Sequence, residues 1–334
     1  PYAIYKVCPP SQFEEDNISV ITFFHYSPHH RLPLSHQKTL NYGNMNKKLF
    51  LTLSLLGCLY TALSSHAQLF VVDTSSIFNQ DSIDTQRIKV QYEMTYLQDT
   101  VSEDAKPGRE TLMLEIGKQY SKCYSYNFYV RDSLLIADAQ AGASKETMLQ
   151  HAAAIGDSRI SYQIFKHYPA GKVTTLDRLA TTNFLCEEKE EMPEWTVLPN
   201  TATLLSYPCQ KATCRFKGRN YTAWYTMEIP ISEGPWKLYG LPGLIIKAED
   251  DKKHYTFSCT GIEQCKTPKP ILINLKGREK VSRPNLNKMY ERMAKDPMSF
   301  IASTAPHVKV SVTDEHGNPM KSFSIPYNPI ELSE

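Results

Sequence analysis

Alternation of apolar and polar side chains dominates the chain from residue 88 onward. In 88–96, apolar or aromatic residues occupy every second position, with polar or charged residues between them. A two-residue period puts one set on the core side of a sheet and the other in solvent, which predicts a half-buried strand. Further strand patterns cover 112–116, 124–130, 160–167, 172–176, 202–207, 210–216, 221–228, 244–248, 255–260 and 308–312.

Two segments have helical spacing instead. Asp132 and Ser133 are predicted to cap a helix that runs to about residue 155 and is interrupted at Gly142. Four apolar side chains at helical spacing predict a second helix over 284–295. With strands in the majority, the fold class is predicted to be mainly β (α+β). We expect a large curved antiparallel sheet, or a half-barrel-like sandwich, with one or two flanking helices.

The N-terminal region has a different pattern. Residues 1–44 show no sustained period, and the chain does not begin with methionine, whereas Met45 opens a basic, then apolar, then small-residue pattern that ends at Ala67. This order is typical of a secretory signal peptide at 45–67, whose apolar stretch is too short for a membrane span. We expect 1–44 to be an upstream extension, the alternative being a disordered true N-terminus. A single β-rich domain is expected over 68–334, without a transmembrane span in the mature form.

The balance of basic and acidic residues limits the classes of partner that this protein is expected to bind. The chain has 37 basic and 35 acidic residues, and the first 67 positions hold five and three of these, which leaves 32 of each. A formally neutral body has no basic stripe for a phosphate backbone, so nucleic acid is not an expected partner.

Six cysteines remain after the leader. Export would favour disulfides among them, although the sequence does not choose the pairing. Cys209 and Cys214 would lie about 16 Å apart on one extended strand, too far for a bridge, whereas a turn between Cys259 and Cys265 would bring that pair together. The candidate disulfide cysteines are Cys123, Cys186, Cys209, Cys214, Cys259 and Cys265.

One glycine- and proline-rich run interrupts the strand patterns at 234–245. Pro242 and Gly243 match the central positions of a type II turn, because proline presets the first φ and glycine accepts a positive second φ. Gly240 would let another backbone or ring approach closely. The notable positions of this run are Gly234, Pro235, Lys237, Gly240, Leu241, Pro242, Gly243, Leu244 and Ile245.

The run resembles the Gly-Leu-Pro-Gly-Leu-Ile signature of the GLPGLI family, a group of exported Bacteroidota envelope proteins without a defined activity. The resemblance continues through about residues 195–245, and Tyr327 to Leu332 resembles the usual ending of the family. Cys214 and Leu238 differ from the residues expected there. The resemblance implies a place in the periplasm or at the outer membrane, and it supplies no catalytic residue.

The usual catalytic spacings are absent from the sequence, including nucleophile elbows, phosphate loops and paired zinc histidines. We therefore expect no metal and no cofactor, and the interpretation leans away from an enzyme. The acidic run 187–191 is expected to be a solvated turn. Arg219, Trp224 and Lys237 are candidate ligand contacts, because cations beside aromatic rings bind carboxylates, sugars or head groups. In the alternative, these residues have only a structural role, with Trp224 in the core and Lys237 at a sheet edge.

The leading hypothesis is a non-catalytic exported protein that binds or supports an envelope component, either an outer-membrane protein or an apolar ligand on the concave face of the sheet. Two alternatives stay open. One is a hydrolase with a site near Arg219 and Lys237, and the other is a structural subunit of a surface assembly with an uncovered edge strand.

A second processing site competes with Ala67, because Leu55 to Cys58 resembles a lipobox. We expect cleavage after Ala67, since the apolar stretch continues past Cys58. Under that prediction, Cys58→Ser leaves both the processed mass and the membrane association unchanged, as intact-mass measurement and fractionation would show. If the variant lost both its processing and its membrane association, lipid attachment at Cys58 would be established instead.

Overall fold

The structure is a computed structural model that describes residues 21–24, 80–155, 158, 160–304, 310–313, 319–320 and 322–332. The predicted signal peptide at 45–67 lies outside the described residues. Strands outnumber helices in the described chain, and twelve of them form one open sheet, which confirms the mainly β class. Its strands are β2 (Asp81–Tyr96), β3 (Gly108–Ile116), β4 (Ser121–Ser125), β5 (Gln163–Lys166), β6 (Lys172–Leu179), β7 (Thr182–Lys189), β8 (Thr196–Leu204), β9 (Tyr207–Phe216), β10 (Arg219–Thr226), β11 (Leu244–Asp250), β12 (Tyr255–Ile273) and β13 (Glu279–Lys280).

Two antiparallel meanders make up this sheet. One contains β2 to β7, the other contains β8 to β12, and they join where β2 pairs with β12 along most of both strands. Only β13 departs from the antiparallel arrangement, because it pairs with β7 in parallel. A second, three-stranded sheet contains β1 (Ile21–Phe24), β14 (Val310–Thr313) and β15 (Pro319–Met320), with β1 inside the segment predicted to be an upstream extension.

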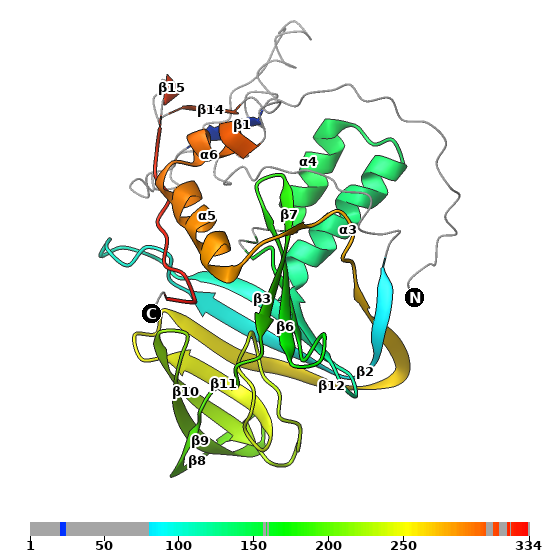
Figure 1. Cartoon of the computed structure of the whole chain (residues 1–334), viewed down its shortest axis with the longest axis vertical. Helices are drawn as coiled ribbons and strands as arrows, with labels where there is room; N and C mark the ends of the chain where they lie inside the picture. Colours follow the sequence, from blue (N-terminus) through cyan, green and yellow to red (C-terminus); the bar gives the residue numbers. More distant parts are fainter. Residues whose placement is uncertain are drawn as a thin grey trace, which may run out of the picture.

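The sheet must curl strongly, because a short link joins strands far apart in the sheet order. From β7 to β8 there are ten strand steps, which would span about 48 Å in a flat sheet. The link between Lys189 and Thr196 can cover at most about 24 Å when extended. The two ends of the sheet therefore approach each other, and in Figure 1 β6 and β7 run at a steep angle to β2 and β12. This geometry confirms the predicted curved sheet.

Four helices are described, in place of the one or two predicted. They lie on the upper side of the molecule in Figure 1, away from β8 to β11. The predicted helix over 284–295 is confirmed as α5, and α6 was missed. The four are α3 (Tyr126–Gln140), α4 (Lys145–Ala154), α5 (Arg283–Lys295) and α6 (Pro297–Thr304).

The strand predicted over 124–130 is wrong. β4 ends at Ser125, whose hydroxyl accepts a hydrogen bond from the Phe128 amide and caps α3. The aromatic alternation after Ser125 is therefore wound into a helix, and Asp132 and Ser133 lie inside α3 rather than at its cap. The interruption predicted at Gly142 is confirmed, since α3 ends at Gln140 and α4 begins at Lys145.

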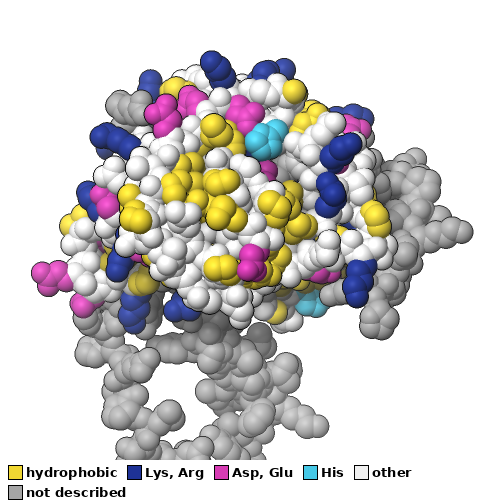
Figure 2. Space-filling view, turned by 90° about the horizontal axis from the view of Figure 1, so that it is seen from below, with side chains coloured by type: hydrophobic (Ala, Val, Ile, Leu, Met, Phe, Trp, Pro, Cys, Tyr) yellow, Lys and Arg dark blue, Asp and Glu magenta, His cyan; other side chains and the backbone are white. Residues whose placement is uncertain are grey.

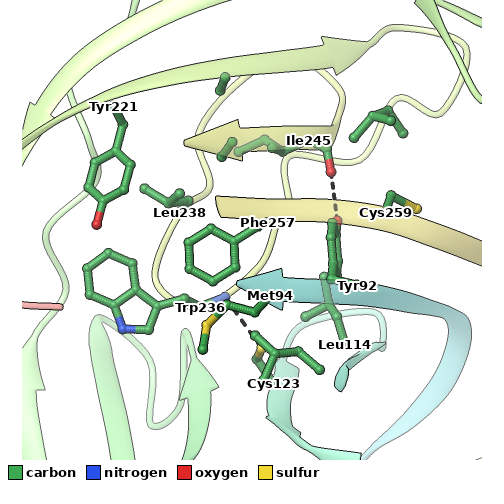
Figure 3. Close-up of a cluster of buried hydrophobic side chains, with 14 of the residues drawn as sticks. Tyr92, Met94, Leu114, Cys123, Tyr221, Trp236, Leu238, Ile245, Phe257 and Cys259 are labelled. Atoms are coloured by element: carbon green, nitrogen blue, oxygen red, sulfur yellow. Dashed lines mark hydrogen bonds between the residues drawn. The ribbon is translucent and has the colours of Figure 1, made fainter. Parts of the chain in front are cut away.

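The concave side of the curled sheet is filled by the connection between β10 and β11, residues 227–243, which we call the plug. Trp236 and Leu238 are almost fully buried in the main hydrophobic core. Figure 3 shows Leu238 between Tyr221 and Phe257. The Trp236 amide also contacts the Cys123 sulfur of β4 at 3.4 Å. The plug thus touches both meanders, and its apolar residues occupy the space in which the sequence placed an apolar ligand.

The glycines of the plug have different roles from those predicted. A positive φ occurs at Gly240 (99°) and at Trp236 (54°), and not at Gly243. The predicted type II turn with a positive φ at Gly243 is therefore wrong. A Cβ on Gly243 would lie 2.0 Å from the Thr226 carbonyl oxygen, so close backbone approach to β10 is what requires glycine there. Gly240 does admit a close neighbour, because its Cβ would lie 2.7 Å from the Met192 side chain.

The six cysteines of the described chain are free thiols in this structure, so the predicted disulfides are not formed in it. Cys209 and Cys214 do share β9, as expected. The turn predicted between Cys259 and Cys265 is wrong, because both lie on β12 and residues 261–264 between them pair with β2.

Replacing Gly243 by alanine tests the close approach. The added methyl group cannot fit against the Thr226 carbonyl, so Gly243→Ala should lower the free energy of unfolding by about 1–3 kcal/mol in urea titration. Gly261→Ala is the matched control, since a Cβ there meets open space. Equal unfolding midpoints for the two variants would contradict the packing role of Gly243.

Candidate functional site

Arg219 and Lys237, both predicted as ligand contacts, are brought to the same part of the structure. Each contacts the last described segment of the chain, residues 322–332, which we call the strap. Trp224 lies elsewhere, because it is five positions after Arg219 on β10 and projects from the opposite face, half-buried. Its ring lies 5.9 Å from Lys211 Nζ on the neighbouring strand. The structure therefore joins two of the three candidates.

Arg219 is buried and uses its whole guanidinium group. Nη1 donates to Asp250 Oδ2 at 2.9 Å, and Nη2 donates to Asn328 Oδ1 at 2.8 Å. Nε donates to the Ile330 carbonyl at 3.0 Å. The planar fork of arginine is suited to several acceptors at once, and here it ties the start of β10 to β11 and to the strap.

Lys237 belongs to a cluster of four charges with Glu188, Arg283 and Glu331. Its ammonium lies 2.6 Å from both Glu188 and Glu331, while Arg283 Nη2 lies 2.8 Å from Glu188. Burial alone would raise the pKa of Glu188, but Lys237 and Arg283 outweigh it and lower that pKa to about 2. The cluster is formally neutral and links β7, the plug, α5 and the strap.

A cavity of about 130 Å³ lies next to this cluster. Its wall contains Lys237, Arg283, Asp177 and Asn287, together with the side chains of Tyr96, Tyr162, Tyr255, Tyr290 and Tyr327. An engineered cavity of about 150 Å³ binds benzene, so this space suits a small molecule or a few waters.

Asp177 is the buried carboxylate of the cavity. Burial raises its pKa, although Tyr290 and Ser161 each donate a hydrogen bond to it at 2.7 Å. Burial also raises the pKa of Tyr327 to about 12, so this phenol is neutral near pH 7. The wall of the cavity therefore contains neutral hydroxyl groups, a carboxyl group that already accepts hydrogen bonds from Tyr290 and Ser161, and the guanidinium of Arg283, which pairs with Glu188.

A second buried cluster anchors the middle of the plug. Lys166 forms an ion pair with Glu233 and donates to the Gly234 carbonyl at 2.6 Å. His167 contacts Glu233 at 3.3 Å and also pairs with Glu190. Burial would raise the pKa of Glu233, but Lys166 and His167 lower it to about 2. In turn, the hydrogen bond to Glu233 raises the pKa of His167.

Several residues of these clusters were not predicted from the sequence as site residues. The acidic run 187–191 was expected to be a solvated turn, yet Glu187 and Glu188 lie on β7, and Glu188 and Glu190 pair with buried cations or His167. Arg283 carried no signal of its own, because its partners come from β7 and the strap. Only Glu331 could have been suspected, from the family resemblance of the segment that contains it.

A metal site is not visible in the part of the chain that the structure describes, where no three His, Cys, Asp or Glu residues converge. Within the same residues, none of the helices has the length and apolar character needed to cross a membrane.

Comparison with known proteins gives one family match. A family model described as "Protein of unknown function (Porph_ging)" matches residues 167–247, which include Arg219, Glu188 and the whole plug. No curated protein matches the chain.

The solved structures that resemble it include two crystal forms of PNGF-II. In space group P21 the identity is 10%, the TM-score is 0.43, and the match covers 64% of this chain and 34% of that one. In space group C2 the corresponding values are 11%, 0.40, 63% and 32%. The chain thus spans about a third of the length of these structures.

The four-charge cluster makes stability depend on pH in a defined window. A carboxyl group whose folded pKa is lowered stabilises the fold above its unfolded pKa of about 4.5, and this contribution is lost as pH falls toward about 2. Glu188→Gln should therefore cost on the order of 3 kcal/mol at pH 7, and the difference from the parent should shrink toward zero near pH 2. Urea unfolding at pH 7, 5, 4 and 3 measures it.

Glu187→Gln is the matched control for this prediction. Glu187 neighbours Glu188 on β7, but its partner Lys172 has a side chain that is 47% exposed, so the loss should stay below about 1 kcal/mol. A pH-independent effect of Glu188→Gln would refute the electrostatic account.

Proposed function

We propose that the chain is an exported, non-catalytic envelope protein of the GLPGLI family that binds a small polar molecule in the cavity beneath the strap. The cavity with five tyrosines, Asp177 and Arg283 in its wall is the observation that carries the proposal. Pockets that combine aromatic walls with a few convergent polar groups are the usual form of small-molecule sites. The family match at 167–247 and the resemblance of the plug motif support the assignment to the family.

The ion pairs of Arg219 and Lys237 favour a binding protein over a hydrolase. Arg219 is held by Asp250 and the strap, and Lys237 is held by two carboxylates, so both cations already have carboxylate partners. Asp177 has both carboxyl oxygens occupied by hydroxyl donors, Tyr290 and Ser161. A hydrolase would need a nucleophile activated by a base within this cavity.

The cavity also changes the class of ligand expected from the sequence. An apolar ligand on the concave face would compete with Trp236 and Leu238, which are buried there. The cavity wall, in contrast, combines apolar side chains such as Met94 and Ile164 with hydroxyl and charged groups, so a small molecule with polar groups to meet the latter fits it. Export remains part of the proposal through the signal-peptide pattern that ends at Ala67.

A surface assembly is the second candidate, and the edge strand β8 favours it. β8 lacks charged residues, whereas edge strands usually carry charge that prevents pairing with another sheet. Val197 is 46% exposed and nearby Leu205 is 49% exposed. Figure 2 shows apolar side chains gathered on the face seen from below, the end of the molecule where β8 to β11 lie in Figure 1. A partner envelope protein at this edge is the corresponding proposal.

Filling the cavity tests the leading proposal. The mature protein, isolated from envelope fractions under native conditions, should carry a bound small molecule detectable by native mass spectrometry. Asn287→Phe places a larger side chain into the wall and should reduce the retained fraction at least tenfold. Asn285→Phe is the matched control, because Asn285 is exposed on the same helix. Retention of nothing by the parent protein, or equal retention by both variants, would reject the cavity as a ligand site.

A further inference from the structure

The strap is held the way a bound peptide is held. Residues 322–332 form neither helix nor strand, so their position depends on contacts with the groove beneath them. That groove is formed by the side chains of Arg219, Tyr255, Lys237 and Arg283 and by the Leu97 carbonyl. Its contacts are concentrated on a run of four residues from Asn328 to Glu331.

Asn328 is recognised through all of its polar groups. Its side-chain Nδ2 donates to the Leu97 carbonyl at 2.6 Å, and its Oδ1 accepts from Arg219 at 2.8 Å. Its backbone amide donates to Gln98 Oε1 at 3.2 Å, and its carbonyl accepts from the Tyr255 hydroxyl. Since a carbonyl can only accept and a guanidinium can only donate, the amide has one orientation, and aspartate cannot reproduce both contacts.

The groove contacts the next three residues through their backbone carbonyls, an apolar side chain and a charged side chain. The carbonyls of Pro329 and Ile330 both accept hydrogen bonds from Arg219. Pro329 has no amide hydrogen to satisfy and favours an extended backbone. The Ile330 side chain packs against the main core, and Glu331 pairs with Lys237 at 2.6 Å. These contacts describe a recognition sequence of asparagine, proline, an apolar residue and an acidic residue.

We propose that this groove is a peptide-binding site selective for an extended Asn-Pro-apolar-acidic segment, that the strap is its resident occupant, and that a segment of this chemistry from a second polypeptide displaces the strap. Each polar group of the strap named above meets a matching donor, acceptor or charge in the groove. The same contacts would form if the segment belonged to another chain. A segment without secondary structure also opens at a lower free-energy cost than the strands of the sheet. The proposal goes beyond the binding of a small molecule in the cavity and does not depend on it.

Competition with the tethered strap determines how the site must be assayed. A tethered segment acts at an effective concentration in the millimolar range, so an added peptide competes poorly until the strap is weakened. The full chain carrying Asn328→Ala and Glu331→Ala keeps every groove residue intact and loosens only the strap. A fluorescent peptide with the sequence of residues 322–332 is the probe, and anisotropy measures its binding.

The weakened chain should bind this peptide saturably, and at least tenfold more tightly than the parent chain does. Peptides carrying Asn328→Asp or Glu331→Lys should bind at least tenfold more weakly than the parent peptide. A strap-exchanged dimer at high concentration would support the same recognition. Absence of saturable binding to a weakened chain that unfolds cooperatively in urea overturns the proposal, as does equal binding of the parent and Asn328→Asp peptides.

If the weakened chain does not fold, a second design decides the question. A protease site placed between Thr304 and Ser322 of the otherwise unchanged chain allows the strap to be cut after folding. The cut strap should then exchange with the labelled peptide, and the Asn328→Asp peptide should fail to exchange. A cut strap that leaves without any uptake of labelled peptide overturns the proposal.

Discussion

The short link between β7 and β8 constrains the whole molecule. It joins strands that are ten steps apart in the sheet order and is too short to cross a flat sheet, so the sheet has to curl until its two meanders face each other. A curl of this kind creates a concave interior that must be filled. The plug fills it, and Trp236, Leu238 and Leu241 contribute side chains to the core that both meanders share.

Buried charges hold the middle of the plug at two positions. Glu233 pairs with Lys166 of β5, and Lys237 lies between Glu188 and Glu331. Removing one member of such a group leaves its partner charged and desolvated, which costs far more than an exposed pair contributes. The same groups therefore define the geometry of the interior and of the groove that holds the strap, so the candidate site and the fold share their stabilising contacts.

Local signals in the sequence predicted much of the fold. Two-residue alternation identified the long strands, because a half-buried strand exposes one face over its whole length, as in β2. The pattern failed at Tyr126 to Val130, where the cap at Ser125 and packing of Leu135 and Ile136 favour a helix over the strand that the aromatic alternation indicated. β8 was predicted only in part, since its irregular pairing between Val197 and Thr201 breaks the two-residue period.

The amino-acid sequence by itself determined the β-rich class, the near balance of basic and acidic residues, and the glycines and cations of the plug, because each follows from composition or from neighbours along the chain. Only the tertiary structure decided that Gly243 is needed for contact with β10, that Lys237 is buried between two carboxylates, and that Arg219 holds a segment more than 100 positions away. The reason is physical: these contacts join residues that are distant in sequence, and curvature of the sheet brings them together.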